Sequence, residues 1–406
     1  MKPLVASAIP EFRFPAEHQL LLYCARLRLA PNDRERLRAL ASSGLNWDEV
    51  LQETRRQSII PFLYHHLQGQ CVDLVPPKLL DTLRDEYVRV AAASMALAAE
   101  LCAITKLLEG QGVASLPYKG PVLALQAYGD IALRTFTDLD LLVRRCDVST
   151  AREILGSRGY SPIDELTLAQ ERAILRFEHN LPLVNSTGDI VVELHWSVAP
   201  AAFTFPIRME GLWERAAPMS LGGQSTRGIC VDDLILLLSV HGARHAWSAI
   251  EWISGIAELI RQPGNVRWDR VIRDAEQLHV ARIVRLGVAL ANNLLDAPIP
   301  APVRRWIDHD LRIPRLVAWV AARLFTPTDR DSATHQWAVF QFEMAVKDGA
   351  REQMRDGFRR VMYPAANDWA AAGLPDALFP LYYLIRPGRL LARYLRHAIA
   401  GKVEMS

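Results

Sequence analysis

The chain has 406 residues, which is more than one ordinary hydrophobic core needs and predicts two or three packed units. Its 47 basic and 45 acidic residues nearly balance, and the formal net charge is +2. This balance argues against a large nucleic-acid footprint, which would need a clustered basic excess, but it leaves room for a small basic groove that binds phosphates.

The cysteines and the N-terminus indicate a reducing compartment. No two cysteines form a CxxC pair, so they favour isolated thiols over a disulfide framework or a zinc site. The N-terminus carries no apolar run of signal-peptide length, and no stretch approaches the roughly eighteen uninterrupted apolar residues of a membrane span. We therefore expect a cytoplasmic protein without a transmembrane helix.

The predicted elements define an α+β fold with three regions. Residues 1–112 have helical periodicity, including a long run over 79–109 that ends at glycine. Residues 113–230 form a mixed α/β core, and residues 231–406 are again helical. Within the core we expect strands, a tight turn and hairpins; the strands span 113–118, 138–143, 179–184 and 190–196, with a weaker pair around Gly222-Gly223. The helices expected after the core span 234–245, 249–261, 268–279, 282–295, 316–324 and 332–361.

The last helix, within residues 387–402, carries a basic face made of Arg389, Arg393, Arg396 and His397. A basic amphipathic helix can lie on an anionic membrane or on a partner protein. The interpretation that we favour is a terminal helix that packs its leucines on the body and exposes its arginines to water.

Asp138 and Asp140 are the most informative residues of the sequence. Side chains two positions apart in a strand point to the same face, so two carboxylates project together from an otherwise apolar segment. Burying two like charges side by side is unfavourable, and a bound Mg²⁺ or Mn²⁺ would remove that penalty. Without metal, their repulsion should destabilise the fold, and we expect removal of the Asp140 charge to stabilise it. The alternative is that Asp138 caps a turn and Asp140 faces solvent at a sheet edge.

Two further features accompany the acid pair. Lys119-Gly120 lies between a strand and a short helix, where backbone amides and a helix N-terminus favour phosphate. Glu193 lies within a β-branched run and shares a face with His195 by the same alternation. The alternatives are a simple strand-to-helix turn and an edge strand with one polar face.

Together, these features resemble the polymerase-β-like nucleotidyltransferase superfamily. The closer similarity is to a bacterial nucleotidyltransferase family whose core reads LKG-x-A-L, then D-x-D-L-L-V, then E-L-H-W. The corresponding segments here are residues 118–125, 138–143 and 192–196, with Arg134 between the first two. The wider superfamily has Gly-Ser or Gly-Gly at the turn, whereas this chain has Lys119-Gly120-Pro121 without a hydroxyl.

The resemblance implies a polymerase-β-like core, a small mixed sheet with helices, and roles for its matching residues. Asp138 and Asp140 would bind two Mg²⁺ or Mn²⁺ ions, and Glu193 would complete the metal site and act as base. Lys119, Arg134 and the Gly120 amide would hold the phosphates of a nucleoside triphosphate (NTP).

A pair of histidines follows in the first helix after the core. His241 and His245 are four residues apart, which places them on one helical face, but the segment lacks the glutamate of zinc metalloproteases. We expect His195, His241, His245 and Trp247 to line a cleft over the nucleotide or the acceptor. A structural role for the two helical histidines is the alternative.

The implied reaction moves a nucleoside monophosphate from an NTP to a hydroxyl or phosphate acceptor and releases pyrophosphate. The modest net charge favours a small molecule, a sugar or a peptide as acceptor over long nucleic acid. Three alternatives stay open: a catalytically weak nucleotide-binding or interaction protein, a toxin-like enzyme that modifies tRNA or protein, and transfer from a sugar nucleotide on the same scaffold.

Overall fold

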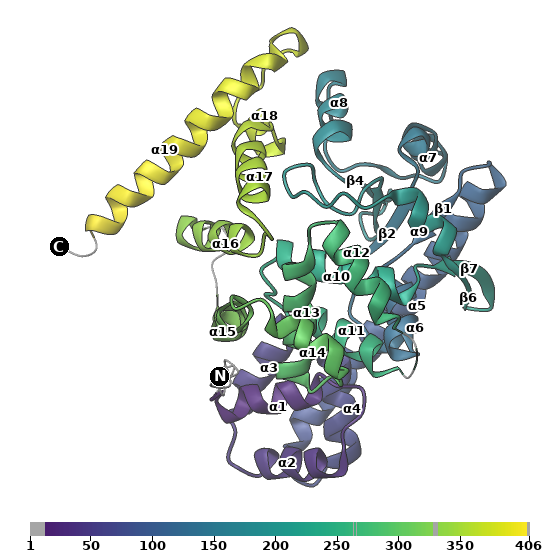
Figure 1. Cartoon of the computed structure of the whole chain (residues 1–406). Helices are drawn as coiled ribbons and strands as arrows, with labels where there is room; N and C mark the ends of the chain where they lie inside the picture. The colour runs from purple at the N-terminus through teal and green to yellow at the C-terminus, as the bar shows by residue number, and fades with distance from the viewer. Residues whose placement is uncertain (1–12, 263, 265, 328–331, 404–406) are drawn as a thin grey trace.

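The computed structural model describes residues 13–262, 264, 266–327 and 332–403. The side chains of residue 333 and of residues 393–403 lie outside this description. Helices surround one small mixed sheet, so the fold is the expected α+β class (Figure 1). The three-region division at residues 112 and 230 stays a prediction.

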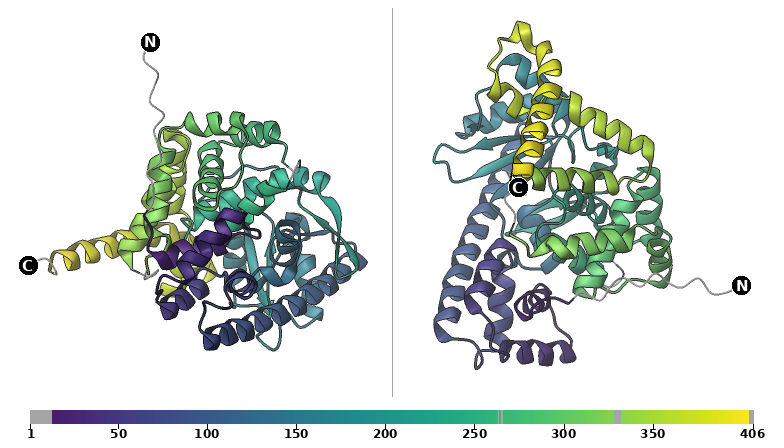
Figure 2. Two further views of the ribbon diagram at one scale, coloured as in Figure 1. Left: turned by 90° about the horizontal axis from the view of Figure 1, so that it is seen from below. Right: turned by 90° about the vertical axis from the view of Figure 1, so that its left-hand side faces the viewer.

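The N-terminal part is helical, as expected. It contains α1 (Ala16–Cys24), α2 (Pro31–Ala41), α3 (Trp47–Arg56), α4 (Ile60–Gln70) and α5 (Pro77–Gly110). The long helix α5 packs on α4 and then continues to β1, β2 and α7, so it joins the N-terminal helices to the sheet (Figure 2, right). By length and composition α5 is the one helix in the described chain that could cross a membrane, and 33% of its apolar window is buried inside the fold.

The central sheet has the strand order β1-β2-β5-β4-β3. Its strands are β1 (Ser115–Pro117), β2 (Asp138–Val143), β3 (Ser161–Pro162), β4 (Asn180–Val184) and β5 (Val191–His195). β2 and β5 are parallel, and every other neighbouring pair is antiparallel. The predicted hairpin of β4 and β5 is confirmed, and it places Asn180 opposite His195.

Four helices and a second hairpin complete the core. They are α6 (Gly120–Tyr128), α7 (Val148–Ser157), α8 (Leu168–Phe177), α9 (Met209–Arg215), β6 (Ala217–Leu221) and β7 (Gln224–Gly228). The strand pair expected around Gly222-Gly223 is therefore confirmed as β6 and β7. Helix α8 was not predicted, although Thr167 and Gln170 form a capping box at its start, which is a recognisable signal of a helix N-terminus.

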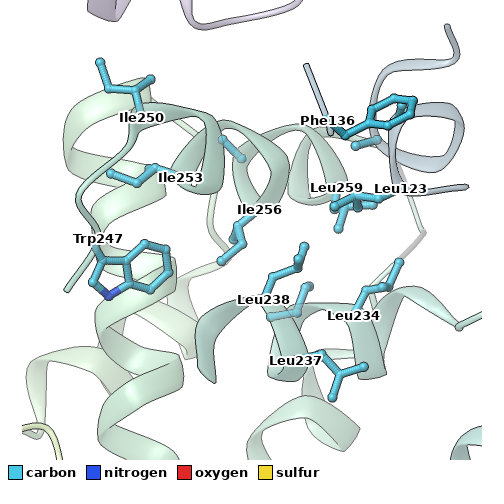
Figure 3. Close-up of a cluster of buried hydrophobic side chains, with 14 of the residues drawn as sticks. Leu123, Phe136, Leu234, Leu237, Leu238, Trp247, Ile250, Ile253, Ile256 and Leu259 are labelled. Atoms are coloured by element: carbon cyan, nitrogen blue, oxygen red, sulfur yellow. The ribbon is translucent and has the colours of Figure 1, made fainter. Parts of the chain in front are cut away.

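The predicted helices after the core are confirmed in their order, and one further helix, Ala301–Asp308, was not predicted and lies between the fourth and the fifth of them. They are α10 (Val231–Arg244), α11 (Ile250–Arg261), α12 (Trp268–Gln277), α13 (Ala281–Leu295), α14 (Ala301–Asp308) and α15 (Ile313–Leu324). Helices α10, α11 and α13 pack on one another, and α11 also packs on α6. Apolar side chains from the C-terminal helices and from α6 therefore meet in one core (Figure 3). Burial of these leucines and isoleucines fixes the position of α10 over the sheet.

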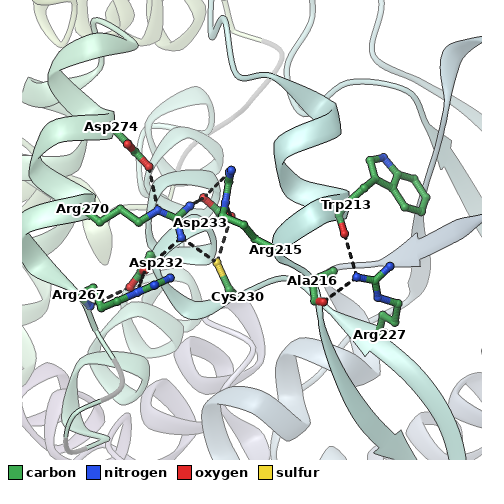
Figure 4. A network of polar contacts seen from close by, with 10 residues as sticks. All are labelled: Trp213, Arg215, Ala216, Arg227, Cys230, Asp232, Asp233, Arg267, Arg270 and Asp274. Atoms are coloured by element: carbon green, nitrogen blue, oxygen red, sulfur yellow. Dashed lines mark hydrogen bonds and ion pairs between the residues drawn. The ribbon is translucent and has the colours of Figure 1, made fainter.

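A polar network secures the start of α10 (Figure 4). Asp233 accepts hydrogen bonds from Arg215 of α9 and Arg270 of α12. Asp232 accepts from the backbone and side chain of Arg267. Both aspartates are buried, and their charges are compensated by these arginines. The network therefore fixes one end of α10, and the opposite end carries His241 and Arg244.

The segment predicted as helical over 332–361 is two helices, α16 (Ala333–Ala345) and α17 (Ala350–Met362), followed by α18 (Ala366–Ala371) and α19 (Tyr382–Val403). Arg386 and Arg389 of α19 form ion pairs with buried Asp368, while Leu384 and Leu391 are exposed. The described part of α19 is thus held by ion pairs more than by leucines, and the helix projects from the body (Figure 2, left). The side chains of Arg393, Arg396 and His397 lie outside the described residues, so membrane or partner contact through them stays a prediction.

Candidate active site

A cavity of about 630 Å³ lies over the polar face of β2, β5 and β4. Its walls come from the turn before α6, the loop before β2, the end of α10, α11 and α16. The predicted site residues that line it are Lys119, Arg134, Asp138, Asp140, Glu193, His195, His241 and His245. Residues from four separate segments of the chain therefore line one cavity.

The three acids share one face of the sheet. Asp138 and Asp140 are two apart on β2, and Asp140 is directly paired with Glu193 in the parallel ladder of β2 and β5. Ligand atoms of Asp140, Glu193 and His195 all lie within 4.8 Å of one another. The alternation of side chains along the two strands is the physical cause of this convergence.

Asp140 is buried and is held in the ionised state by two neighbours. Lys119 Nζ and His195 Nε2 each lie 2.9 Å from Asp140 Oδ1. Burial alone would raise the pKa of Asp140, but the Lys119 ammonium and the His195 ring outweigh it and lower that pKa. Although burial opposes its charge, contact with Asp140 and Glu193 raises the pKa of His195. The negative charge of Asp140 is therefore neutralised by the side chains of Lys119 and His195.

Asp138 has the opposite environment. Burial first, and then the charges of Asp140 and Glu193, raise the pKa of Asp138 to about 6. Among the described residues, Asp138 forms no ion pair, in contrast to Asp140. The expectation that removal of the Asp140 charge would relieve the repulsion is corrected accordingly, because the uncompensated carboxylate is Asp138.

Glu193 lies at the other side of the cluster. Asn180 Nδ2 donates a hydrogen bond to Glu193 Oε2 at 2.8 Å, and His195 Nε2 lies 3.1 Å from the same oxygen. Burial would raise the pKa of Glu193, but the His195 contact outweighs it, so the pKa is lowered. Asn180 was not predicted as a site residue, although its position opposite His195 in the predicted hairpin could have indicated it.

The turn between β1 and α6 requires glycine. Gly120 has φ +53°, and a Cβ atom there would lie 3.4 Å from the Asp138 carbonyl oxygen. Lys119 is the residue immediately before α6, and its ammonium turns toward β2 and Asp140. The close approach of the turn to β2 therefore brings the helix N-terminus and the lysine to the acid cluster.

Arg134 reaches the cavity from the segment after the short 3-10 helix Ile131–Leu133. Its Nε donates to Glu251 Oε1 of α11 at 2.5 Å, and both side chains are buried. Arg134 is thus neutralised by a residue 117 positions away, which the sequence analysis did not anticipate.

The histidine pair lines the part of the cavity wall that the end of α10 forms. His241 lies on α10 and His245 just beyond its end, with ring centroids 4.6 Å apart, and Trp252 packs against both at 5.3 Å. Burial, above all, lowers the pKa of His241, so this ring is neutral. The expectation for Trp247 is wrong: it does not line the cavity, because its fully buried ring packs against Gly242 and Gly287 in the core (Figure 3).

The donor set fits a divalent cation. Two carboxylates and one imidazole nitrogen converge, with a third carboxylate, Asp138, on the same face. Carboxylate oxygens suit Mg²⁺ and Mn²⁺, and an imidazole nitrogen adds preference for Mn²⁺ over Mg²⁺.

The small mixed sheet and its acid cluster define a nucleotidyltransferase-type core. A family profile described as "Uncharacterised nucleotidyltransferase" matches residues 43–296, more than half of the chain, and the chain belongs to this family. All described cavity residues except His335 and Val339 lie within the matched range. No curated protein and no solved structure matches the chain.

Proposed function

We propose that this protein transfers a nucleoside monophosphate from an NTP to a hydroxyl or phosphate group of a small-molecule, sugar or peptide acceptor. The observation that carries the proposal is the direct pairing of Asp140 with Glu193, with Asp138 on the same face, inside a cavity of about 630 Å³. Family membership supports the same reaction class. A volume of this size is typical of small-molecule sites.

The three acids and the turn before α6 have separate roles in this proposal. For a hydroxyl acceptor, Glu193 takes the proton while the acceptor oxygen bonds to the α-phosphorus. The bond from that phosphorus to the bridging oxygen breaks, and pyrophosphate leaves with both electrons. Lys119 and the Gly120 amide hold the triphosphate, since the turn combines a cation with a helix N-terminus. Divalent ions held by Asp138, Asp140 and Glu193 would supply positive charge that offsets the charge on phosphate.

The test separates transfer from simple hydrolysis. The protein is incubated with Mn²⁺ and NTPs labelled at the α- or the γ-phosphate, together with a heat-stable small-molecule extract as the acceptor source. We expect the α-label to move to a new product and the γ-label to appear in pyrophosphate. Asp140→Asn and Glu193→Gln should reduce transfer by at least a hundredfold, whereas exposed Asp189→Asn should match the wild type. Transfer by Asp140→Asn at the wild-type rate would contradict the assignment.

A second candidate is a nucleotide-binding protein with little catalysis. It is favoured by one observation: Lys119 and His195 both contact the Asp140 oxygen that a metal ion would use. In that case NTP would bind with Mn²⁺, but neither label would leave the NTP. The same labelled assay, with a filter-binding measurement beside it, distinguishes the two functions.

A further inference from the structure

Three cations line the cavity among the described residues, and one of them lacks an acidic partner. Lys119 is paired with Asp140, and Arg134 is paired with Glu251. Arg244, the last residue of α10, forms no ion pair within the described chain. Its NH1 lies 3.1 Å from His179 Nε2 and 3.5 Å from the Val198 carbonyl oxygen. Arg244 was not among the site residues predicted from the sequence.

The sheet order places Arg244 on the side of Glu193 that is distant from the triphosphate turn. Lys119 follows β1, whereas His179, which contacts Arg244, directly precedes β4. β2 and β5, which carry the acids, lie between them. Neighbouring strands are about 4.8 Å apart, so the backbones of β1 and β4 are separated by roughly 14 Å, and the Lys119 ammonium reaches from the turn after β1 to Asp140 on β2. An NTP held at Lys119 and a group held at Arg244 would therefore flank the acid cluster from opposite sides.

The surroundings of Arg244 favour the binding of an anion. Arg244 is half-buried and stays charged, and its neighbours at contact distance are neutral groups; the carboxylates of Glu343, Glu178 and Glu193 act on it only from beyond ion-pair distance. Burial without a partner disfavours a charge strongly. His179 Nδ1 is also buried without a hydrogen-bond partner in the described chain. The planar fork of an arginine matches the two oxygens of a phosphate or a carboxylate.

We propose that Arg244 binds an oxyanion group, a phosphate or a carboxylate, of the acceptor substrate. This inference rests on the proposed function and narrows its acceptor to anionic molecules. The acceptor oxygen would then reach the α-phosphorus beside Glu193 while its anionic group is held at the end of α10. The NTP itself is the competing source of an oxyanion for Arg244, and the experiment separates the two.

Inorganic phosphate serves as the probe, titrated calorimetrically into the protein with Mn²⁺, with and without a non-hydrolysable α,β-methylene NTP. We expect phosphate to bind in both cases with affinities within threefold. Arg244→Gln should weaken phosphate binding at least tenfold and leave the affinity for the NTP analogue within twofold. Lys119→Gln is the matched contrast, because it should weaken binding of the analogue and, once the analogue is present at saturation, leave phosphate binding unchanged. Displacement of phosphate by the analogue, or wild-type phosphate affinity in Arg244→Gln, would overturn the proposal.

Two further measurements keep the test decisive. Without ligand, Arg244→Gln should melt at a higher temperature than the wild type, because a half-buried charge without an ion-pair partner is removed; a purely structural arginine would give a lower melting temperature. If Arg244→Gln does not fold, Arg244→Lys keeps the charge without the fork and should bind phosphate several-fold more weakly. Failure of the NTP analogue to bind the wild-type protein would refute the proposed function, while the phosphate titrations would still decide whether Arg244 forms an oxyanion site.

Discussion

Lys119 Nζ lies 2.9 Å from Asp140 Oδ1, so the lysine expected to meet triphosphate also neutralises a metal-binding acid in the ligand-free protein. The contact joins the β1–α6 turn to β2 and is shielded from solvent on both sides. Asp138, two residues away on the same strand, has no comparable partner in the described chain. The two neighbouring aspartates should therefore respond in opposite directions when their charges are removed.

Asp138→Asn should stabilise the metal-free protein, and Asp140→Asn should destabilise it. Loss of the Asp138 charge relieves burial and repulsion and should add about 1 kcal/mol to the free energy of unfolding at pH 8. Loss of the Asp140 charge leaves Lys119 and His195 without their carboxylate and should cost on the order of 3 kcal/mol. Urea denaturation in EDTA measures both, with Asp189→Asn as the neutral control. A stabilised Asp140→Asn would refute this account of the charges.

Divalent metal should stabilise the wild type through the acid cluster. A ligand that binds only the native state at about a hundred times its Kd adds about 2.7 kcal/mol to the free energy of unfolding. We expect Mn²⁺ to give a larger shift in Tm than equimolar Mg²⁺, because His195 offers a nitrogen ligand. Glu193→Gln should lose most of the Mn²⁺ shift, and Asp189→Asn should retain it. Equal shifts in Glu193→Gln and the wild type would place the metal elsewhere.

Gly242→Ala should be among the most destabilising glycine substitutions. A Cβ atom at residue 242 would lie 2.5 Å from the buried ring of Trp247, which is held in a left-handed backbone conformation with φ +54°. Overpacking of this kind costs about 1–3 kcal/mol. Gly69→Ala, at an exposed position of helix α4 where a Cβ atom would meet nothing within 4 Å, should be neutral or slightly stabilising. Thermal melts of both variants, read by circular dichroism, test the packing of α10 on Trp247.

His66 should make the free energy of unfolding decrease as the pH falls. Burial, above all, lowers the pKa of His66 to about 4, although its ring contacts the Arg26 carbonyl oxygen at 2.6 Å. As the pH falls from about 6.5 toward 4, the unfolded chain takes up a proton at this ring while the folded chain does not, so stability is lost in that window. The stability advantage of the wild type over His66→Gln should shrink by about 2 kcal/mol between pH 7.5 and pH 5. Leu63→Ala, which weakens the same helix without a titratable group, should keep a constant difference from the wild type.

The sequence by itself determined which side chains share a face. Alternation along a strand is a property of the local backbone, so Asp138 and Asp140 project together, as do Glu193 and His195. Hydrophobic periodicity likewise predicted α5, the helices α10 to α13, and α15, because burial of one face depends on residues three and four apart. The family resemblance rested on these same local segments.

Only the tertiary structure decided which charges neutralise one another and which side chains face the cavity. Arg134 pairs with Glu251 across 117 positions, and Arg244 meets His179 across 65. Trp247 enters the core instead of the cavity, since the chain reverses just after α10 at two residues with positive φ. Such contacts depend on how distant helices and strands pack, and no short window of sequence contains both partners.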